Sequence, residues 1–522
     1  MRRCSWLPFL RLLSSSASAS RVSMNFAPSV SAADTIFALS SGAGVRAGVS
    51  VVRISGPAAK DVLLQMAPGR EAVLPEPRRA VLRKLRSPGA TGGELIDEVL
   101  ALWFPGPRSF TGEDTVELHT HGSRAVVSAT LEALGTMEGL RMAEPGEFTR
   151  QAFFNGRMDL TEVEGLSDLI NADTEAQRKQ ALRQMGGAQR ERYEAWRHEL
   201  LNALAHTEAL IDFGEDAEDV TNDALRGAMD RLSKLRVEVE RHLGDGGRGE
   251  VVREGVRVAI LGPPNAGKST LLNALAERPA AIVSDVAGTT RDVVQVTLQL
   301  GGLPVLVSDT AGLREATNDP IEVQGMMRAA DEAKRAQIQV WVFDAAAPPT
   351  RTSQLDPVAT LDALDDETVD KSANVHGTAD GTGDAPSDVM QLLVLNKLDL
   401  VGATSRPVCE LFPSSQQWQL SCETGDGLQP FLDALSGIVA SRYGEVDGEP
   451  VLITRARHRE HLRRCASALE AFEQYAEDME YAPLDLAAEE IRIAAEEIGR
   501  ITGRIDVEEL LDVIFRDFCI GK

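Results

Sequence analysis

Long apolar runs are absent from this sequence. No stretch of eighteen apolar residues occurs along its 522 residues, so no membrane-spanning helix is expected. Cysteine is sparse as well, and the five cysteines show no paired spacing. This excludes a disulfide framework and a zinc cluster and is typical of a reducing compartment. Internal repeats are also missing, and the length predicts a globular chain of several domains.

Positive charge is in deficit, because the formal net charge is −25. Such acidity repels phosphate backbones, so a basic partner would have to supply most of the affinity for a nucleic acid. Residues 1–30 are the exception, with four arginines, many serines and no acid. That is the composition of a mitochondrial transit peptide, and a disordered tail is the alternative.

Hydrophobic periodicity predicts four regions after this leader. Short alternating stretches in residues 31–150 indicate a mixed α/β domain, and residues 151–250 switch to helical spacing. In residues 251–445 strands alternate with helices, which indicates a parallel sheet, and helix returns in residues 446–522. The two helical blocks would form one discontinuous domain into which the α/β unit is inserted.

Three local signals refine this division. Thr161 and Glu164 fit a capping box that would start a helix. Residues 244–250, GDGGRGE, have the composition of a flexible linker. Residues 351–390 hold nine acids against two bases, which predicts a disordered surface insertion.

A phosphate-binding loop follows a predicted strand and precedes a predicted helix at GPPNAGKST, from Gly262 to Thr270. Its glycines let backbone amides turn toward phosphates, Lys268 would reach the β and γ oxygens, and the Ser269 hydroxyl would bind Mg²⁺. A chance glycine turn is the alternative, but two further motifs oppose it.

The first is DTAG, from Asp309 to Gly312, where a carboxylate can hold the metal and an amide can sense the γ-phosphate. The second is NKLD, in which Asp399 can accept two hydrogen bonds from guanine, a donor pair that adenine lacks. Ser421 in SCETG fits the loop that closes on the base. The nucleotide is therefore predicted to be GTP.

These motifs, with RISGP, WFPGPRSFTGED, PGEFTRQAFFNGRMDLTEVEGLSDLI, DVAGTTRD and the terminal FCIGK, closely resemble the MnmE/TrmE family of tRNA-modification GTPases. The resemblance implies an N-terminal folate-binding-like α/β domain, a discontinuous helical domain and an inserted Ras-like P-loop GTPase domain. It also implies a homodimer formed through the N-terminal domain. By family match, the GTP-binding residues are Asn265, Ala266, Gly267, Lys268, Ser269, Thr270, Ser284, Thr289, Thr290, Asp309, Thr310, Ala311, Gly312, Asn396, Lys397, Asp399 and Ser421.

The resemblance further implies two metal ions. Ser269 and Thr290 would hold Mg²⁺. K⁺ would be held by Asn265, Ser284, Val286 and Thr289, at the place where an arginine finger would bring its charge.

The pattern offers two candidates for the residue that orients the attacking water. Leu313 stands where Ras-like enzymes place a glutamine, and an apolar side chain cannot polarise water. Glu322 matches the catalytic glutamate of the family, with Glu315 as its competitor and a solvated loop charge as the plain alternative.

A folate site is implied in the N-terminal domain. Arg53, Glu117, Arg157 and Lys522 match the family's contacts to a tetrahydrofolate derivative, either 5,10-methylene or 5-formyl. Exposed charges on a half-buried sheet are the alternative. His119 and His121 lack a third metal ligand and are interpreted as hydrogen-bonding groups.

Cys519 has three interpretations. It fits the position of a prenylated cysteine, although the terminal Lys522 argues against this, and it could be a passive small hydrophobe. The family's CxGK ending favours a catalytic cysteine near the folate, carried by a helix that Asp506 would begin. Cys465, on an apolar helix face, is predicted to be core.

The resulting prediction is a mitochondrial matrix GTPase that works with an FAD-dependent partner subunit, which alone carries the FAD. Together they would modify C5 of the wobble uridine, position 34, of mitochondrial tRNAs, with a taurinomethyl- or carboxymethylaminomethyl-type product. One alternative is a non-catalytic GTPase switch in ribosome or tRNA handling. Another is a folate one-carbon enzyme that GTP only regulates.

Overall fold

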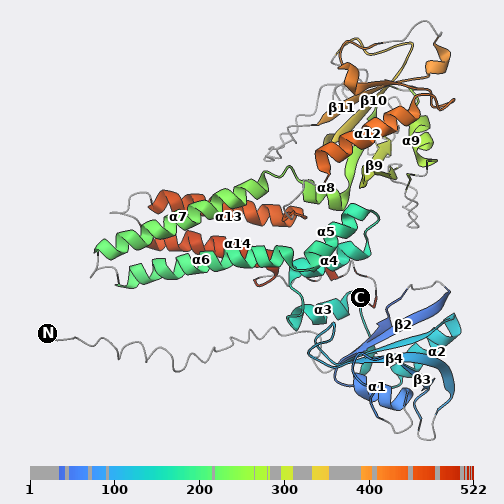
Figure 1. Cartoon of the computed structure of the whole chain (residues 1–522), viewed down its shortest axis with the longest axis vertical. Coiled ribbons are helices and arrows are strands. Elements are labelled where there is room, and N and C mark those ends of the chain that lie inside the picture. The colour runs from blue at the N-terminus through green and yellow to red at the C-terminus, as the bar shows by residue number, and fades with distance from the viewer. Residues whose placement is uncertain are drawn as a thin grey trace, which may run out of the picture. The chain divides into compact units, whose positions relative to one another are not determined.

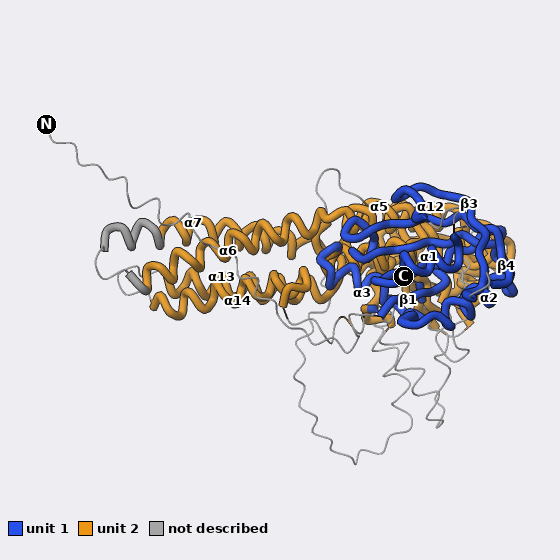
Figure 2. The backbone as a smooth tube through the Cα atoms, turned by 90° about the horizontal axis from the view of Figure 1, so that it is seen from below, with its two compact units in different colours: residues 1–157, 515–522 blue, residues 158–514 orange. Residues whose placement is uncertain are grey.

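The structure is a computed structural model that divides into two compact units (Figure 2): residues 1–157 with 515–522 form unit 1, and residues 158–514 form unit 2. It describes residues 34–521 except 42–45, 69–72, 90–92, 214–217, 264, 279, 282–294, 310–331, 352–388, 402–407, 445–450, 477–482, 506–510, 512–513, 516–517 and 519. The side chains of residues 212–213 and 218–225 are also not described. None of the helices within these ranges combines the length and apolarity that a bilayer crossing requires.

Unit 1 is built on a six-stranded sheet in the order β3-β4-β5-β2-β1-β6 (Figure 1). Neighbouring strands are antiparallel, except for the parallel pair β1 and β6. Its elements are β1 (Thr35–Leu39), β2 (Ala47–Ser55), α1 (Ala59–Met66), β3 (Val81–Arg86), β4 (Leu95–Phe104), β5 (Thr115–Gly122), α2 (Arg124–Gly135), β6 (Leu140–Met142) and α3 (Glu147–Phe154).

The two faces of this sheet differ because side chains alternate along each strand. Val52 and Ile54 of β2 are fully buried and belong to the core that includes side chains of α1 and α2. Arg53 lies between them in sequence, so its side chain projects from the opposite face, where its register partner is Glu117 of β5. The alternation along the strands therefore places Arg53 and Glu117 next to each other on the face opposite the core.

The C-terminal segment belongs to unit 1. Ile520 forms an antiparallel bridge with Pro145, and a Cβ on Gly521 would lie 2.2 Å from the carbonyl oxygen of Leu39. Gly521 also has a φ of +94°, which favours glycine. Phe515 and Phe518 are buried.

Unit 2 contains a bundle of four long helices that lie side by side in Figures 1 and 2. Helices that precede and follow the second sheet share one hydrophobic core, so the helical domain is discontinuous, as predicted. Cys465 is 1% exposed in this core, and burial raises the pKa of its thiol to about 12. The helices are α4 (Leu160–Ile170), α5 (Glu175–Met185), α6 (Ala188–Phe213), α7 (Glu218–Leu243), α8 (Arg248–Glu254), α13 (Ala456–Ala476) and α14 (Leu484–Thr502).

The second sheet has the order β12-β11-β10-β7-β9-β8, and every pair is parallel except β8 with β9. The antiparallel edge strand β8 and the short β12 were not expected, because the predicted strands were the apolar ones at the centre. The elements are β7 (Val256–Leu261), α9 (Lys268–Ala276), β8 (Gln295–Leu300), β9 (Leu303–Asp309), β10 (Ile338–Asp344), β11 (Met390–Asn396), β12 (Gln417–Gln419) and α12 (Leu428–Tyr443). This P-loop α/β arrangement confirms the predicted fold class.

Two local predictions were wrong. Helix α4 begins after Asp159, whose carboxylate accepts from the Glu162 amide at 2.8 Å while Glu162 accepts from the Asp159 amide at 2.8 Å. The capping box therefore lies two residues before the predicted pair of Thr161 and Glu164. Because Asp159 and Glu162 form the capping box, the side chain of Glu164 is not used as a cap and lies in the protein interior.

The predicted flexible linker at residues 244–250 is a fixed turn that leads into α8. Gly246 and Gly247 have φ values of +69° and +72°, which allow the chain to reverse between α7 and α8. Arg459 of α13 donates to Asp245 at 2.8 Å and to Glu250 at 3.0 Å. A distant arginine thus orders a segment whose composition alone predicts mobility.

Candidate functional site

The loop after β7 has the backbone of a phosphate-binding loop. A Cβ on Gly262 would lie 2.1 Å from the carbonyl oxygen of Val342, and one on Gly267 would lie 2.2 Å from Nδ2 of Asn396. Asn265 has a φ of +61°, in the left-handed region. Only glycine fits at the two crowded positions, and helix α9 starts directly afterwards at Lys268.

Lys268 is the cation of this loop. Its ammonium donates to the carbonyl oxygens of Gly262 and Pro263 at 2.8 and 2.9 Å. Burial lowers its pKa, and the nearby charge of Asp309 opposes that shift. Asp309 ends β9, where its register partner is Ile260 near the end of β7. The parallel strands therefore bring this carboxylate to the edge of the sheet from which the loop departs.

Asn396 connects the phosphate loop to the segments that are predicted to bind the base. Its side-chain amide donates to the carbonyl oxygen of Ala266 at 3.0 Å, and its amide oxygen accepts from the Cys422 backbone at 3.1 Å. The side chain is 2% exposed. Lys397, with a φ of +63°, donates to Asp344 at 3.0 Å and ties the end of β11 to β10.

The carboxylate that the sequence predicts to bind guanine lies on the surface at this edge. Asp399 is exposed, and Ser421 donates its hydroxyl to Asp399. The Thr424 amide donates to the Ser421 hydroxyl at 3.2 Å, so the SCETG turn holds the donor in place. Asp399 is therefore oriented by a neutral group and has capacity for the two donors of a guanine ring.

The side-chain oxygens described in this region are suitable ligands for the Mg²⁺ ion of a bound nucleotide. Ser269 is exposed in the first turn of α9, and hydroxyl and carboxylate oxygens are suitable Mg²⁺ ligands. Asn265 and Thr270 are exposed, and Ala266 is buried in the loop. The other nucleotide, metal and catalytic predictions lie outside the described residues: Ser284, Val286, Thr289, Thr290, Thr310, Ala311, Gly312, Leu313, Glu315 and Glu322.

The second group of predicted residues lies in unit 1. Arg53 donates from Nε and Nη2 to Oε1 of Glu117, at 3.0 and 2.9 Å. Its guanidinium also lies 5.0 Å from the ring centroid of Phe110 and 5.7 Å from that of Phe148. The two charged side chains remain 18% and 19% exposed, so the pair is accessible.

Arg157 reaches the same segment of unit 1, since its Nε donates to the carbonyl oxygen of Ser109, the neighbour of Phe110. Of the four predicted folate residues, Arg53 therefore contacts both Glu117 and Phe110, and Arg157 contacts the adjacent Ser109. Lys522 and the predicted catalytic Cys519 lie outside the described residues, as does the helix start at Asp506.

The two histidines of β5 differ: His121 is an exposed hydrogen-bonding group, whereas the buried Nε2 of His119 has no hydrogen-bond partner among the described residues. His121 contacts Asp97 at 2.7 Å, and Nε2 of His119 lies 3.7 Å from the second oxygen of Glu117. Within the described ranges no group of three or more His, Cys, Asp and Glu side chains is placed to hold a metal ion.

Sequence reasoning missed a buried ionic network around Glu164. This carboxylate is 1% exposed and accepts from Arg457 at 2.7 and 2.9 Å, while His458 contacts it at 2.9 Å. One turn further along α4, Asp168 accepts from Arg455 at 2.8 Å and from Arg253 at 3.1 Å. The partners are up to 294 residues apart in sequence, so no local pattern could reveal them.

The fold and the loop geometry together define a P-loop GTPase with a second charged site in its N-terminal unit. Comparison with known families supports this class. Residues 35–157 match the family model described as the GTP-binding protein TrmE N-terminus, and residues 160–519 match the MnmE helical domain.

Relatives cover almost the whole chain. The tRNA modification GTPase MnmE of Parvibaculum lavamentivorans is 49% identical over 492 residues, which cover 94% of this chain and 100% of the relative. The mitochondrial 5-taurinomethyluridine-tRNA synthase subunit GTPB3 is 46% identical in Danio rerio, over 94% of this chain and 93% of the relative. The Homo sapiens protein of the same name is 46% identical, over 95% of each chain. This chain belongs to the MnmE family of tRNA modification GTPases.

Proposed function

We propose that this chain is a K⁺-dependent GTPase that, with an FAD-dependent partner subunit, modifies C5 of the wobble uridine of mitochondrial tRNAs. The product would be of the taurinomethyl or carboxymethylaminomethyl type. The observation that carries the proposal is that one chain holds a guanine nucleotide site in unit 2 and an accessible Arg53–Glu117 pair between aromatic rings in unit 1. The names of relatives, which include mitochondrial 5-taurinomethyluridine-tRNA synthase subunits, support the proposed reaction and compartment.

The site in unit 1 fits a folate. A flat ring can pack beside the half-buried Phe110, and Glu117 has a second oxygen with which to accept from an amino-pyrimidinone. Two buried polar atoms nearby, Oγ of Ser109 and Nε2 of His119, have no hydrogen-bond partner in the described part of the chain. Arg53, Glu117, Arg157 and Lys522 would hold the tetrahydrofolate derivative, which supplies a one-carbon unit.

The proposed catalytic groups are Glu322 for orienting water, with Glu315 as the competing residue, and Cys519 beside the folate. Both flanking residues of Cys519 belong to unit 1, together with Arg53 and Glu117. Mg²⁺ would bind Ser269 and Thr290. K⁺ would bind Asn265 with Ser284, Val286 and Thr289, and its charge would stabilise the transferring phosphoryl group.

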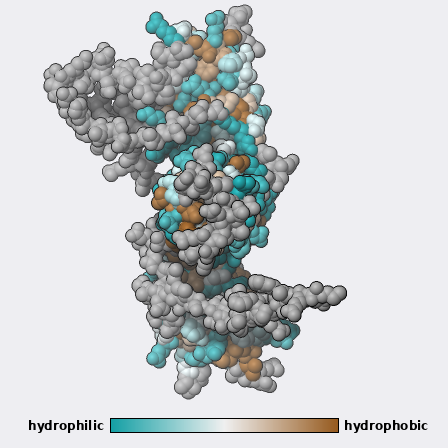
Figure 3. Space-filling view, turned by 90° about the vertical axis from the view of Figure 1, so that its left-hand side faces the viewer, coloured by the Kyte–Doolittle hydropathy of each residue, from teal (hydrophilic) through white to brown (hydrophobic). Residues whose placement is uncertain are grey.

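A second copy of the chain is the proposed occupant of the open face of unit 1. Leu82 of β3 and Leu100 of β4 are register partners and are 67% and 45% exposed. Val49 and Leu95 of the same sheet are 58% and 47% exposed. Figure 3 shows brown, hydrophobic patches among hydrophilic ones on the described surface, and a homodimer interface would cover patches of this kind.

The remaining parts of the proposal concern the partner and the compartment. A net charge of −25 leaves most of the tRNA contact to a basic, FAD-carrying partner. Residues 1–30 would direct the chain to the mitochondrial matrix. The proposed domain boundaries are those of the five regions given above, residues 1–30, 31–150, 151–250, 251–445 and 446–522.

The first experiment measures GTP hydrolysis in matched KCl and NaCl, with ATP as the control nucleotide. We expect K⁺ to accelerate the reaction, and Asn265→Ala to reduce the K⁺-stimulated rate by about tenfold or more. Asn273→Ala, an exposed asparagine in α9, is the matched control and should retain the stimulation. Equal rates in both salts would contradict the K⁺ assignment.

The second experiment measures the modified wobble uridine by mass spectrometry of tRNA incubated with the partner complex. Glu117→Gln and Cys519→Ser should lose the modification and retain GTP hydrolysis. Glu98→Gln, on the neighbouring strand β4 and 54% exposed, is the matched control. Unchanged uridine in both variants would favour the non-catalytic switch, and one-carbon turnover without tRNA would favour the folate enzyme.

A further inference from the structure

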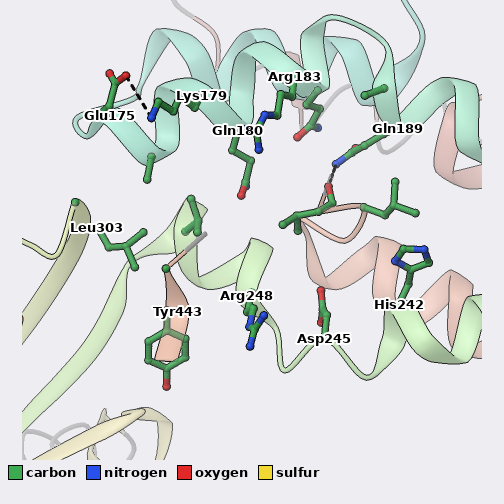
Figure 4. A pocket seen from close by; sticks show the side chains of 18 of the residues that line it. Glu175, Lys179, Gln180, Arg183, Gln189, His242, Asp245, Arg248, Leu303 and Tyr443 are labelled. Carbon is green, nitrogen blue, oxygen red and sulfur yellow. Dashed lines mark hydrogen bonds and ion pairs between the residues drawn. The ribbon is translucent and has the colours of Figure 1, made fainter. Parts of the chain in front are cut away.

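A pocket of about 560 Å³ lies within unit 2, away from the phosphate loop (Figure 4). Helix α5 forms one wall, and the turn between α7 and α8 forms another. The remaining walls are the β8–β9 turn at Gly301 to Leu303, the end of α12 at Tyr443, and residues 451–452. The space is large enough for a small organic molecule.

The lining of this pocket carries an excess of positive charge, unlike the chain as a whole. Lys179, Arg183, Arg241 and Arg248 are cations of the lining, and Glu175 and Asp245 are its acids.

Both acids are already engaged by arginines outside the lining. Asp245 accepts from Arg459 at 2.8 Å, and Glu175 accepts from Arg178 at 2.8 and 2.6 Å. Glu175 also lies 4.0 Å from the ammonium of Lys179, an ion pair within the lining that Figure 4 shows, so the charge that remains for an anion is that of Arg248.

Arg248 is the clearest of these cations. It is the first residue of α8 and is half-buried, yet among the described residues it makes no hydrogen bond and no ion pair. A partly desolvated guanidinium without a partner is unfavourable, so an anion that reaches it gains a charge-assisted hydrogen bond.

The remaining lining is apolar with a few acceptors. Val252, Leu303 and Leu452 are at most 8% exposed and provide hydrophobic surface. Gln184 and Gln189 are each 2% exposed, and each has an amide oxygen with no hydrogen-bond partner among the described residues. An occupant with an apolar body, an anionic group and a hydrogen-bond donor matches all three features.

The pocket is connected to the nucleotide site through α8. Arg248 and Val252 of this helix line the pocket, while Arg253 donates to Asp168 of α4 at 3.1 Å. Helix α8 ends at Glu254 and β7, which leads to the phosphate loop, begins at Val256. We propose that the pocket binds a small amphipathic organic anion, such as an aryl phosphate, and that its occupancy changes the rate of GTP hydrolysis through α8.

The binding test uses 1-naphthyl phosphate and the full chain loaded with GDP and Mg²⁺, so that the nucleotide site is filled. Calorimetric titration should show saturable binding with one site per chain. Arg248→Ala should weaken this binding by about tenfold or more, because one charge-assisted contact is lost. Arg463→Ala, an exposed arginine of α13 outside the lining, is the matched control and should bind as the unaltered chain does.

Two further probes separate the anionic group from the apolar body. Inorganic phosphate should compete only weakly, and 1-naphthol should bind at least about tenfold more weakly than 1-naphthyl phosphate. Lys179→Ala provides a second variant at an exposed position and should cause a smaller loss than Arg248→Ala. Absence of saturable binding, equal affinity for 1-naphthol, or unchanged affinity in Arg248→Ala would overturn the assignment.

The proposed effect of pocket occupancy on GTP hydrolysis is tested by measuring the hydrolysis rate in the presence and absence of 1-naphthyl phosphate. The rate should change for the unaltered chain and for Arg463→Ala, and it should stay constant for Arg248→Ala. A rate that does not respond in the unaltered chain would refute the coupling. No tRNA or partner subunit is needed, so failure here is independent of the proposed tRNA modification.

Discussion

Glu117 in unit 1 and Glu164 in unit 2 are both paired with arginine, but their surroundings differ. Glu164 is 1% exposed and is contacted by Arg457 and His458, so its oxygens are fully engaged. Glu117 is 19% exposed, and Arg53 engages only one of its oxygens. A buried, saturated carboxylate is part of the structure, whereas an accessible one with remaining acceptor capacity can bind a ligand.

The largest expected effect comes from breaking the saturated pair. Glu164→Gln should lower the free energy of unfolding by about 3–5 kcal/mol, because buried arginines lose their counter-charge. Urea unfolding measures this change. Glu175→Gln, at an exposed pair on α5, is the control and should leave the unfolding curve unchanged. A shift for Glu164→Gln as small as that of the control would contradict the structural role.

The second effect is the pH dependence of the same network. Burial, with the charge of Arg457, lowers the pKa of His458 to about 4, although its contact with Glu164 acts in the opposite direction. Nδ1 of this ring has no hydrogen-bond partner among the described residues, so a second proton would be buried unpaired.

The pKa of this histidine is about 6.5 in the unfolded chain and about 4 in the folded chain. The unfolded chain therefore binds the proton first as the pH falls, and the contribution of His458 to stability is fully present only above pH 6.5. This contribution is lost as the pH falls toward 4 and amounts to about 3 kcal/mol, from 2.5 pKa units at 1.36 kcal/mol each. Asp159, whose pKa is raised to about 6 by burial, acts in the opposite direction. The difference in stability between the unaltered chain and His458→Asn, followed from pH 7 to 4, isolates the histidine. A constant difference would show that His458 titrates normally.

Asp399 extends the comparison to a carboxylate that contacts a neutral hydroxyl. Asp399→Asn should weaken GTP binding by about 10–100-fold, because two charge-assisted hydrogen bonds to guanine are lost. Xanthosine triphosphate should gain affinity, since its C2 carbonyl accepts from the new amide. Displacement of a fluorescent nucleotide reports both changes. Equal affinities for GTP in the two proteins would remove Asp399 from the base site.

The smallest effect on stability is expected at Glu117. Glu117→Gln should lower the free energy of unfolding by about 1 kcal/mol, because Arg53 keeps its contacts with two aromatic rings. The measurement is urea unfolding beside Glu164→Gln. If both variants lost equal stability, the distinction between a structural and a binding carboxylate would fail.

Local motifs allowed much of the nucleotide site to be predicted. The phosphate loop, NKLD and SCETG are short strings whose backbone geometry depends on residues within a few positions of one another. Asn396 contacts both Ala266 of the phosphate loop and Cys422 of SCETG, and the order of the parallel strands brings these motifs together. By contrast, the capping box was predicted two residues too late, because the equivalent local pair Asp159 and Glu162 starts the helix. The linker at residues 244–250 was predicted wrongly because Arg459, far along the chain, fixes it.

Periodicity and contiguous motifs were sufficient to identify the fold class and the family, and they predict the chemistry of the GTP site. The packing of distant segments was needed to show that Glu164 is a buried counter-ion, that Arg53 pairs with Glu117 beside Phe110, and that Arg157 contacts Ser109. The tertiary structure also revealed the cationic pocket beside α8. Each of these depends on side chains between 48 and 294 residues apart, and at such separations burial and charge compensation are properties of packing.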